Sequence, residues 1–309
     1  MHVLDADQFT PESILEVFQN ADSLRDMLAE PETRLELAHR HNDKQICSLF
    51  YEPSTRTRTS FEAAALKLGM GVVSTENAAE FSSAAKGETI EDTTRVLNQY
   101  GFAAIVIRHP ETGAVARAAA VSDVPILNAG DGKGEHPTQC LLDAYTIYRQ
   151  FGRLDNLRVV MGGDLRNGRT VRSLAKVLAK YPGNELVFVS IPALQMADDI
   201  KEILTQSGTK FSEADDLETA FQGTDVVYWT RLQKERLDPD EPFDSSAFII
   251  STESLGYLPE KAIIMHPLPR VDEISPEVDT DPRAKYFEQA GNGLYVRMAL
   301  LDQVVGGKR

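Results

Sequence analysis

Short runs of apolar residues alternate along the chain with longer segments in which apolar residues recur every three or four positions. The first pattern is typical of buried strands, and the second is typical of amphipathic helices. The sequence therefore predicts strands at 45–51, 72–74, 103–107, 124–128, 157–161, 186–190, 226–229 and 262–265. It predicts helices at 11–29, 57–69, 88–99, 112–120, 136–150, 169–180, 197–206 and 290–306. Thr10, placed before Pro11, is the expected N-cap of the first helix.

Strands that alternate with helices in this way indicate parallel sheets with helices on both faces. A chain of 309 residues is also close to the limit at which a single hydrophobic core stops growing, at roughly 250–300 residues. A hinge-like turn at 151–156 separates the first series of strands from the second. We therefore predict an α/β protein with two doubly wound parallel-sheet domains linked by helices. The last helix, 290–306, is expected to pack back on the first domain.

Polar and cationic residues stand where the predicted strands of the first half end. Ser54–Arg58 follow the strand at 45–51, Arg108 follows 103–107, and His136 follows 124–128. Because ligands bind at the carboxyl edge of open parallel sheets, we expect these three loops to converge. The first of them also begins a helix, and it places hydroxyls and guanidiniums beside the free N–H groups of the first turn. So many donors predict an anion site, with phosphate favoured. The alternative is a capped surface helix with its arginines in solvent.

Composition narrows the class of protein. The formal net charge of −15 argues against general binding of nucleic acid or anionic membranes. The chain has no run of about 18 apolar residues, so no membrane span is expected. Residues 1–7 lack the pattern of a signal peptide, and Cys47 and Cys140 are interpreted as buried, free thiols in a reducing compartment. These features predict a cytoplasmic protein. No His, Cys, Asp or Glu residues have the spacing of a metal site.

Several single motifs are ambiguous by themselves. The stretch 163–170 resembles a phosphate-binding P-loop, but Arg169 stands where that motif requires Lys, and the glycine spacing does not fit a dehydrogenase. A cation at a helix start instead favours a carboxylate ligand beside Arg169. His136 is as consistent with a structural as with a functional role, while His109 and His266 each precede proline and are interpreted as turn caps. The small, polar residues of 77–88 predict a mobile loop.

Taken in order, these motifs resemble the aspartate/ornithine carbamoyltransferase family over essentially the whole chain. The matching segments are Ser54–Arg58, Arg108–Pro110, His136–Gln139 and His266–Arg270. The stretch 230–236 looks like the aspartate-binding loop of the family, while the H-C-L-P and S-M-G motifs of its ornithine enzymes do not occur. The resemblance implies transfer of a carbamoyl group from carbamoyl phosphate to L-aspartate. The products are N-carbamoyl-L-aspartate and phosphate, a step of pyrimidine biosynthesis that needs no cofactor or metal.

The resemblance also implies a role for individual residues. The phosphate is held by Ser54, Thr55, Arg56 and Thr57. The carbamoyl oxygen is polarised by Thr57, Arg108 and His136. The carbamoyl nitrogen is held by Gln139 and by the backbone at Pro267 and Leu268. The aspartate carboxylates are bound by Arg169, Arg231 and Gln233.

The resemblance further implies a carbamoyl phosphate-binding domain at 1–137 plus 291–309 and an aspartate-binding domain at 138–290. A homotrimer is expected, in which the loop supplies Ser82 and Lys86 to the active site of a neighbouring subunit. Ala85 stands where some members of the family have Lys, which predicts a weaker grip on phosphate. Binding of a separate regulatory chain stays open. So do two other functions, transfer to a different amino acid and nucleotide binding at 163–170.

Overall fold

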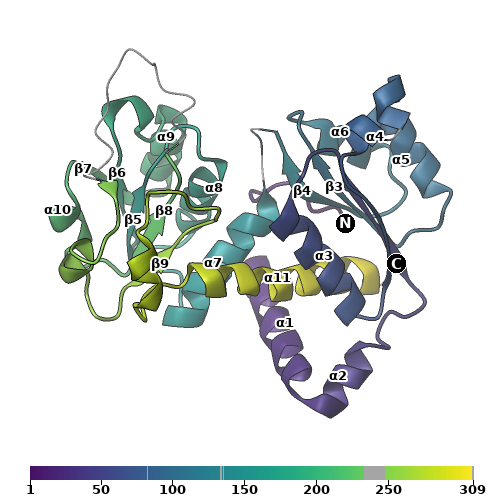
Figure 1. The fold of residues 1–309 in the computed structure, drawn as a ribbon, viewed down its shortest axis with the longest axis horizontal. Helices are drawn as coiled ribbons and strands as arrows, with labels where there is room; N and C mark the ends of the chain where they lie inside the picture. The colour runs from purple at the N-terminus through teal and green to yellow at the C-terminus, as the bar shows by residue number, and fades with distance from the viewer. Residues whose placement is uncertain (82, 133, 135, 233–247, 308–309) are drawn as a thin grey trace. The chain divides into compact units, whose positions relative to one another are not determined.

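The computed structural model describes residues 1–81, 83–132, 134, 136–232 and 248–307. The chain divides into two compact units (Figure 1). Unit 1 consists of Met1–Leu141 and Gly291–Arg309, and unit 2 consists of Leu142–Ala290. The expected division placed the boundaries at 137/138 and 290/291.

Unit 1 contains a four-stranded parallel sheet in the order β2-β1-β3-β4. Its strands are β1 (Gln45–Phe50), β2 (Gly71–Thr75), β3 (Ala104–His109) and β4 (Ile126–Asp131). The helices that follow the first three strands are α3 (Thr55–Lys67), α5 (Ile90–Asn98) and α6 (Ala114–Ala120). The central strands β1 and β3 are almost continuously buried because their runs of apolar residues meet other apolar residues on both faces.

Unit 2 contains a five-stranded parallel sheet in the order β7-β6-β5-β8-β9. Its strands are β5 (Arg158–Gly162), β6 (Glu185–Val189), β7 (Lys210–Ala214), β8 (Val226–Trp229) and β9 (Ile263–Met265). Its connecting helices include α8 (Arg169–Leu178), α9 (Asp198–Ser207) and α10 (Leu217–Phe221). The prediction of two parallel-sheet α/β domains is confirmed.

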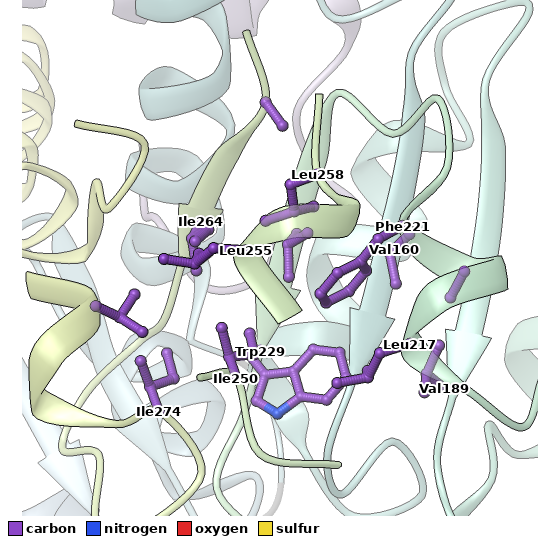
Figure 2. Close-up of a cluster of buried hydrophobic side chains, with 14 of the residues drawn as sticks. Val160, Val189, Leu217, Phe221, Trp229, Ile250, Leu255, Leu258, Ile264 and Ile274 are labelled. Carbon is purple, nitrogen blue, oxygen red and sulfur yellow. The ribbon is translucent and has the colours of Figure 1, made fainter. Parts of the chain in front are cut away.

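A cluster of apolar side chains around Trp229 forms a core of unit 2 (Figure 2). The Trp229 ring is fully buried, and the Phe221 ring meets it edge-on with centroids 6.1 Å apart. Gly162 of the adjacent strand makes room for this ring, because a Cβ atom there would lie 2.1 Å from it. Ile250 and Ile274 pack into the same cluster and tie the chain after β9 to the sheet.

Two long helices cross from one unit to the other. Helix α7 (Pro137–Phe151) begins in unit 1 and ends in unit 2, whereas α11 (Tyr286–Gly306) does the reverse. Within unit 1, α11 is bonded to α1 (Pro11–Ala29), since Arg25 donates to Asn292 at 2.6 Å. Thr10 caps α1 as predicted, in a capping box with Ser13. The expected linkage by helices is therefore confirmed.

The structure also contains elements that the pattern did not predict. Helix α2 (Pro31–Leu37), strand β7 and helix α10 are such elements, and 77–88 contains α4 (Ala78–Phe81) and the 3₁₀ helix η1 (Ser83–Lys86). Helix α2 buries only Leu37, and β7 is an edge strand with no buried residue. Segments such as α2 and β7 carry almost no apolar periodicity to detect, and α10 has only five residues, too few for its apolar spacing to indicate a helix. Of the helices that the structure describes, none combines the length and the hydropathy needed to span a bilayer.

Candidate functional site

The candidate residues of unit 1 lie at the carboxyl ends of three neighbouring strands. Ser54–Thr57 follow β1, Arg108 belongs to the end of β3, and His136 follows β4. These strands are adjacent in the sheet, and Phe50 is in register with Arg108. The N–H of Tyr51 donates to the carbonyl of Arg108 at 2.9 Å, so the two strand ends stay paired up to the loops.

Helix α3 begins with donors and without acidic residues. Ser54 is its N-cap by position, but the hydroxyl makes no capping hydrogen bond, and the first turn contains no Asp or Glu. Thr55 and Arg56 are exposed. Partial burial of the guanidinium nevertheless lowers the pKa of Arg56. An anion bound at this turn would meet the positive end of the helix dipole together with these side chains.

Each of the two terminal nitrogens of the Arg108 guanidinium contacts a protein oxygen. Its Nη1 donates to the carbonyl of Ala129 at 3.2 Å, and its Nη2 lies 2.6 Å from Oε1 of Glu52. Its Nε is buried and makes no hydrogen bond within the described part of the chain. These contacts fix the direction of the guanidinium and use two of its five N–H donors, so donors remain for a ligand oxygen.

Thr57 and His136 meet between α3 and the start of α7. Thr57 Oγ1 lies 3.4 Å from His136 Nε2, and both residues are buried. Gln139 is half-buried on the first turn of α7, where its N–H donates to the carbonyl of His136 at 3.0 Å. Thus two residues that stand 79 positions apart form a contact beside the donor-rich turn.

The segment after β2 provides the remaining predicted residues of unit 1. Lys86 is the last residue of η1 and is exposed. Ser82 lies outside the described residues.

Unit 2 repeats the same arrangement. Arg169 begins α8 after β5, Arg231 follows β8, and Pro267 and Leu268 follow β9. Strands β5, β8 and β9 are neighbours in the sheet, so these side chains share one sheet edge. Arg169 and Arg231 are both half-buried. Gln233 lies outside the described residues.

The loop between β5 and α8 is closed by its own carboxylate. Asp164 is fully buried, and its side chain accepts from the backbone N–H of Asn167 at 2.9 Å. In a P-loop, by contrast, the backbone N–H groups point at phosphates. Gly163 has a φ of +100°, and a Cβ atom there would lie 2.0 Å from the carbonyl oxygen of Thr230. The glycines therefore serve close packing, and the geometry does not favour nucleotide binding.

Two of the histidines cap turns as the sequence indicated. His109 Nδ1 accepts from the N–H of Glu111 at 3.0 Å, and His266 Nδ1 accepts from the N–H of Leu268 at 2.8 Å. Burial is the main cause that lowers the pKa of His109. His266 has a second partner that sequence reasoning missed, because Glu273 Oε1 lies 2.7 Å from its Nε2. The segment 266–273 is neither helix nor strand, so a spacing rule could not pair the two residues and only the folded turn reveals the contact.

No cluster of three or more His, Cys, Asp or Glu side chains suited to a metal ion occurs among the residues that the structure describes. Burial raises the pKa of the Cys47 thiol to about 11, and Cys140 is buried as well. A thiol with such a pKa is a poor nucleophile at neutral pH.

Two family models match the chain. Residues 1–149 match "Aspartate/ornithine carbamoyltransferase, carbamoyl-P binding domain". Residues 155–304 match "Aspartate/ornithine carbamoyltransferase, Asp/Orn binding domain".

Curated proteins and solved structures are similar over nearly the full length. Aspartate carbamoyltransferase from Oryza sativa is 49% identical over 99% of this chain and 85% of its own length. The Arabidopsis thaliana enzyme is 54% identical over 85% of this chain and 68% of its own. The catalytic subunit of M. jannaschii aspartate transcarbamoylase is 42% identical over 99% of both chains, with a TM-score of 0.91. The Trypanosoma cruzi enzyme in complex with carbamoyl aspartate and phosphate is 38% identical over 98% of this chain and 95% of its own, with a TM-score of 0.88.

The comparisons contradict the predicted cytoplasmic location. The relatives from Oryza sativa, Pisum sativum and Arabidopsis thaliana are named as chloroplastic enzymes. The prediction relied on two buried cysteines and on the first residues of the chain. Free thiols indicate a reducing compartment without saying which one, so neither feature could separate the cytosol from a plastid.

Proposed function

This chain belongs to the aspartate/ornithine carbamoyltransferase family, and we propose that it transfers the carbamoyl group of carbamoyl phosphate to the α-amine of L-aspartate. The products are N-carbamoyl-L-aspartate and phosphate. The observation that carries this proposal is the edge of the unit 1 sheet. There the acid-free first turn of α3, the fixed Arg108 fork and the Thr57–His136 contact stand at three adjacent strand ends.

The phosphate of the first substrate binds at the first turn of α3. Backbone N–H groups and the side chains of Ser54, Thr55, Arg56 and Thr57 donate to its oxygens. Charge-assisted hydrogen bonds of this kind are the strong ones, each contributing about 1.5–3 kcal/mol. The net charge of −15 makes this local concentration of donors necessary, because the rest of the protein repels anions.

The carbamoyl oxygen points at Thr57, Arg108 and His136. Attack by the amine converts the carbonyl into a tetrahedral oxyanion, so donors placed there bind the transition state more tightly than the substrate. Removing one donor from such a site typically costs about 10²–10³-fold in rate. Arg108 suits this role because Glu52 and the carbonyl of Ala129 fix its orientation before the substrate arrives. Gln139 and the backbone at Pro267 and Leu268 hold the carbamoyl nitrogen.

Arg169, Arg231 and Gln233 bind the two carboxylates of aspartate. Both arginines lie at the carboxyl edge of the unit 2 sheet, at the ends of neighbouring strands β5 and β8. Guanidinium groups match carboxylates through paired, parallel hydrogen bonds. The departing phosphate accepts the proton of the attacking amine, so the chain need not supply a strong base.

The variant Arg56→Ala and the matched variant Arg56→Lys would test this site. Arg56 is exposed, so neither change should alter the free energy of unfolding by more than about 0.5 kcal/mol. Phosphate release that depends on aspartate should fall by about 10²-fold or more in Arg56→Ala, because the fork and its charge are both lost. Arg56→Lys keeps the charge and should retain part of the rate. Wild-type turnover in Arg56→Ala would refute the phosphate site.

We further propose that the chain forms a homotrimer whose active sites are shared, with Ser82 and Lys86 reaching a neighbouring subunit. Leu66 of α3 is 60% exposed and Val73 of β2 is 50% exposed, so a subunit contact over these elements would remove their apolar surface from water. Lys86 is exposed as this role requires.

Mixed trimers test the sharing. Arg56→Ala and Lys86→Ala chains, each inactive alone, should recover activity at roughly a quarter of the sites in an equal random mixture. No recovery in trimers verified by mass would argue against shared sites. The same mass measurement separates a bare trimer from an assembly that contains a separate regulatory chain.

A further inference from the structure

His266 and Glu273 form a buried pair in unit 2 that the proposed mechanism does not use. His266 follows strand β9, and its Nε2 lies 2.7 Å from Glu273 Oε1. Both side chains are only 1% exposed. A buried carboxylate beside a buried imidazole is costly unless every polar atom has a defined partner. The hydrogen-bond partners of each polar atom therefore indicate how the pair is held.

The hydrogen bonds fix the proton positions of this pair. The backbone N–H of Leu268 donates to His266 Nδ1 at 2.8 Å. An amide N–H can only donate, so Nδ1 is an acceptor and the ring proton sits on Nε2, where it is donated to Glu273. The second carboxylate oxygen accepts from the N–H groups of Val271 and Asp272 at 3.2 Å each. Burial alone would raise the pKa of Glu273, but these hydrogen bonds lower it further than burial raises it.

The backbone of Glu273 and of the residues next to it is held by hydrogen bonds to Ile250. Ile250 donates to the carbonyl of Glu273 at 3.0 Å and accepts from the N–H of Ser275 at 2.9 Å. Ile274 lies in the apolar cluster around Trp229, where Figure 2 shows it near Ile250. The carboxylate thus stands on rigid structure and can orient the imidazole.

A second buried chain of hydrogen bonds holds the same turn. The side-chain oxygen of Gln289 accepts from the backbone N–H of His266 at 2.8 Å. The amide nitrogen of Gln289 donates to Asp143 at 2.7 Å, and Asp143 accepts from the hydroxyl of Tyr228 at 2.7 Å. The turn after β9 is therefore fixed from the β8 side as well as from Glu273.

These bonds meet at a residue with an unusual backbone. Leu268 has a φ of +53°, a conformation that residues other than glycine rarely adopt. Such conformations are strained and persist only where the surroundings impose them. The bond from its N–H to His266 Nδ1 is one such restraint.

We propose that His266 is a positioning residue that sets the Leu268 backbone for the carbamoyl nitrogen, with Glu273 fixing the tautomer of its ring. This inference rests on the proposed role of Pro267 and Leu268. It assigns a task to two residues that do not touch substrate. Misplacing a substrate-holding group by about 1 Å can cost on the order of 10²-fold in rate.

Two amide variants separate the two bonds of His266. The carboxamide oxygen of His266→Asn reaches the place of Nδ1 and keeps an acceptor for Leu268, but the shorter side chain no longer donates to Glu273. The carboxamide of His266→Gln reaches the place of Nε2 and keeps a donor for Glu273, but it leaves the Leu268 N–H unsatisfied. His266→Asn should therefore be the less stable variant, because a buried carboxylate loses its partner. His266→Gln should have the lower kcat/KM for carbamoyl phosphate, by about 10–100-fold relative to wild type.

The isosteric variant Glu273→Gln provides an independent arm that does not depend on either His266 variant folding. Its amide group must face either the His266 Nε2–H or the N–H groups of residues 271 and 272, and all of these are donors. Turning the ring to its other tautomer only moves the conflict to Leu268. We expect about a tenfold or larger fall in kcat/KM for carbamoyl phosphate. The exposed Glu277→Gln is the matched control and should behave like wild type.

Inhibition by inorganic phosphate distinguishes positioning from general damage. Phosphate lacks the carbamoyl group and is assigned to unit 1, so its inhibition constant should stay within about twofold of wild type in every variant that is folded by circular dichroism. Equal activity of His266→Asn and His266→Gln, or wild-type activity of Glu273→Gln, would overturn the inference. So would a loss of activity that follows the order of stability. Arg56→Ala reports on the proposed site separately, so a failure of that site is recognised independently.

Discussion

Replacing Thr57 by valine should abolish most of the activity while leaving the fold nearly unchanged. Thr57 is 7% exposed, and its hydroxyl lies 3.4 Å from His136 Nε2, at the outer limit of a hydrogen bond. This contact therefore contributes to the free energy of unfolding at or below the usual 0.5–1.5 kcal/mol of a protein hydrogen bond. Valine has nearly the same shape, so we expect the free energy of unfolding to fall by about 1 kcal/mol or less.

The same hydroxyl is expected to donate to the oxyanion, where a single donor is worth about 2.7–4 kcal/mol. The value of kcat should therefore fall by about 10²–10³-fold. Steady-state phosphate release gives kcat and KM, and urea denaturation gives the stability. The catalytic loss should exceed the stability loss by about 2 kcal/mol or more.

Thr59→Val on the same helix is the matched control. Thr59 is exposed, and its hydroxyl donates to the carbonyl of Thr55 at 2.6 Å. It loses a hydroxyl from α3 without losing a donor from the candidate site, so its kcat should match wild type. A Thr57→Val enzyme with kcat within threefold of wild type would refute the oxyanion assignment.

Three further outcomes follow from buried or paired groups. Asp302→Ala should lower the free energy of unfolding by about 1–3 kcal/mol, as measured by thermal denaturation. The reason is that the buried Asp302 carboxylate accepts from Arg40 at 2.6 and 2.9 Å and lies 2.9 Å from the His41 ring. Asp281→Asn should flatten the acid limb of the stability curve. Hydrogen bonds from Arg283 lower the pKa of Asp281, so its stabilisation is complete above the unfolded pKa of about 3.9 and is lost as the pH falls through the folded pKa. Cys47, whose thiol has a pKa of about 11, should not react with a thiol reagent at pH 8 until the chain unfolds.

Each of these outcomes has a control or a contradicting result. Asp43→Ala, at a site that is 71% exposed, should leave the melting temperature unchanged, and an equal loss in both variants would argue against the Asp302 contacts. The exposed Asp215→Asn controls for the charge change in the acid titration. An unaltered acid limb in Asp281→Asn would contradict the predicted loss of stabilisation by Asp281 as the pH falls. Rapid labelling of Cys47 in the native protein would contradict its burial.

The sheets could be predicted from the sequence because their strands carry dense apolar runs. Strand β1 is buried at five consecutive positions, and β8 is buried throughout. Parallel strands buried on both faces must be apolar at nearly every position, and that pattern is easy to detect. Strand β7 has no buried residue and was missed for the opposite reason.

The position of the candidate residues was predictable where they follow a strand end. Ser54–Thr57, Arg108 and His136 stand there in unit 1, and Arg169 and Arg231 stand there in unit 2. Contacts made only by folding were not predictable. Glu52 lies beside Arg108 at the ends of two different strands, and Glu273 lies beside His266 across an irregular turn. Helical and strand periods apply only within one regular element, so no pattern could pair these residues.

The most direct test of carbamoyl transfer to aspartate is a competition between two acceptors. The enzyme is given carbamoyl phosphate labelled with ¹³C in the carbonyl and equal concentrations of aspartate and ornithine, and the products are resolved by NMR. We predict that essentially all of the label appears in N-carbamoyl-L-aspartate, with one phosphate released per product formed. Label in citrulline at a comparable or higher level, or phosphate release without any carbamoylated amine, would contradict the proposed function.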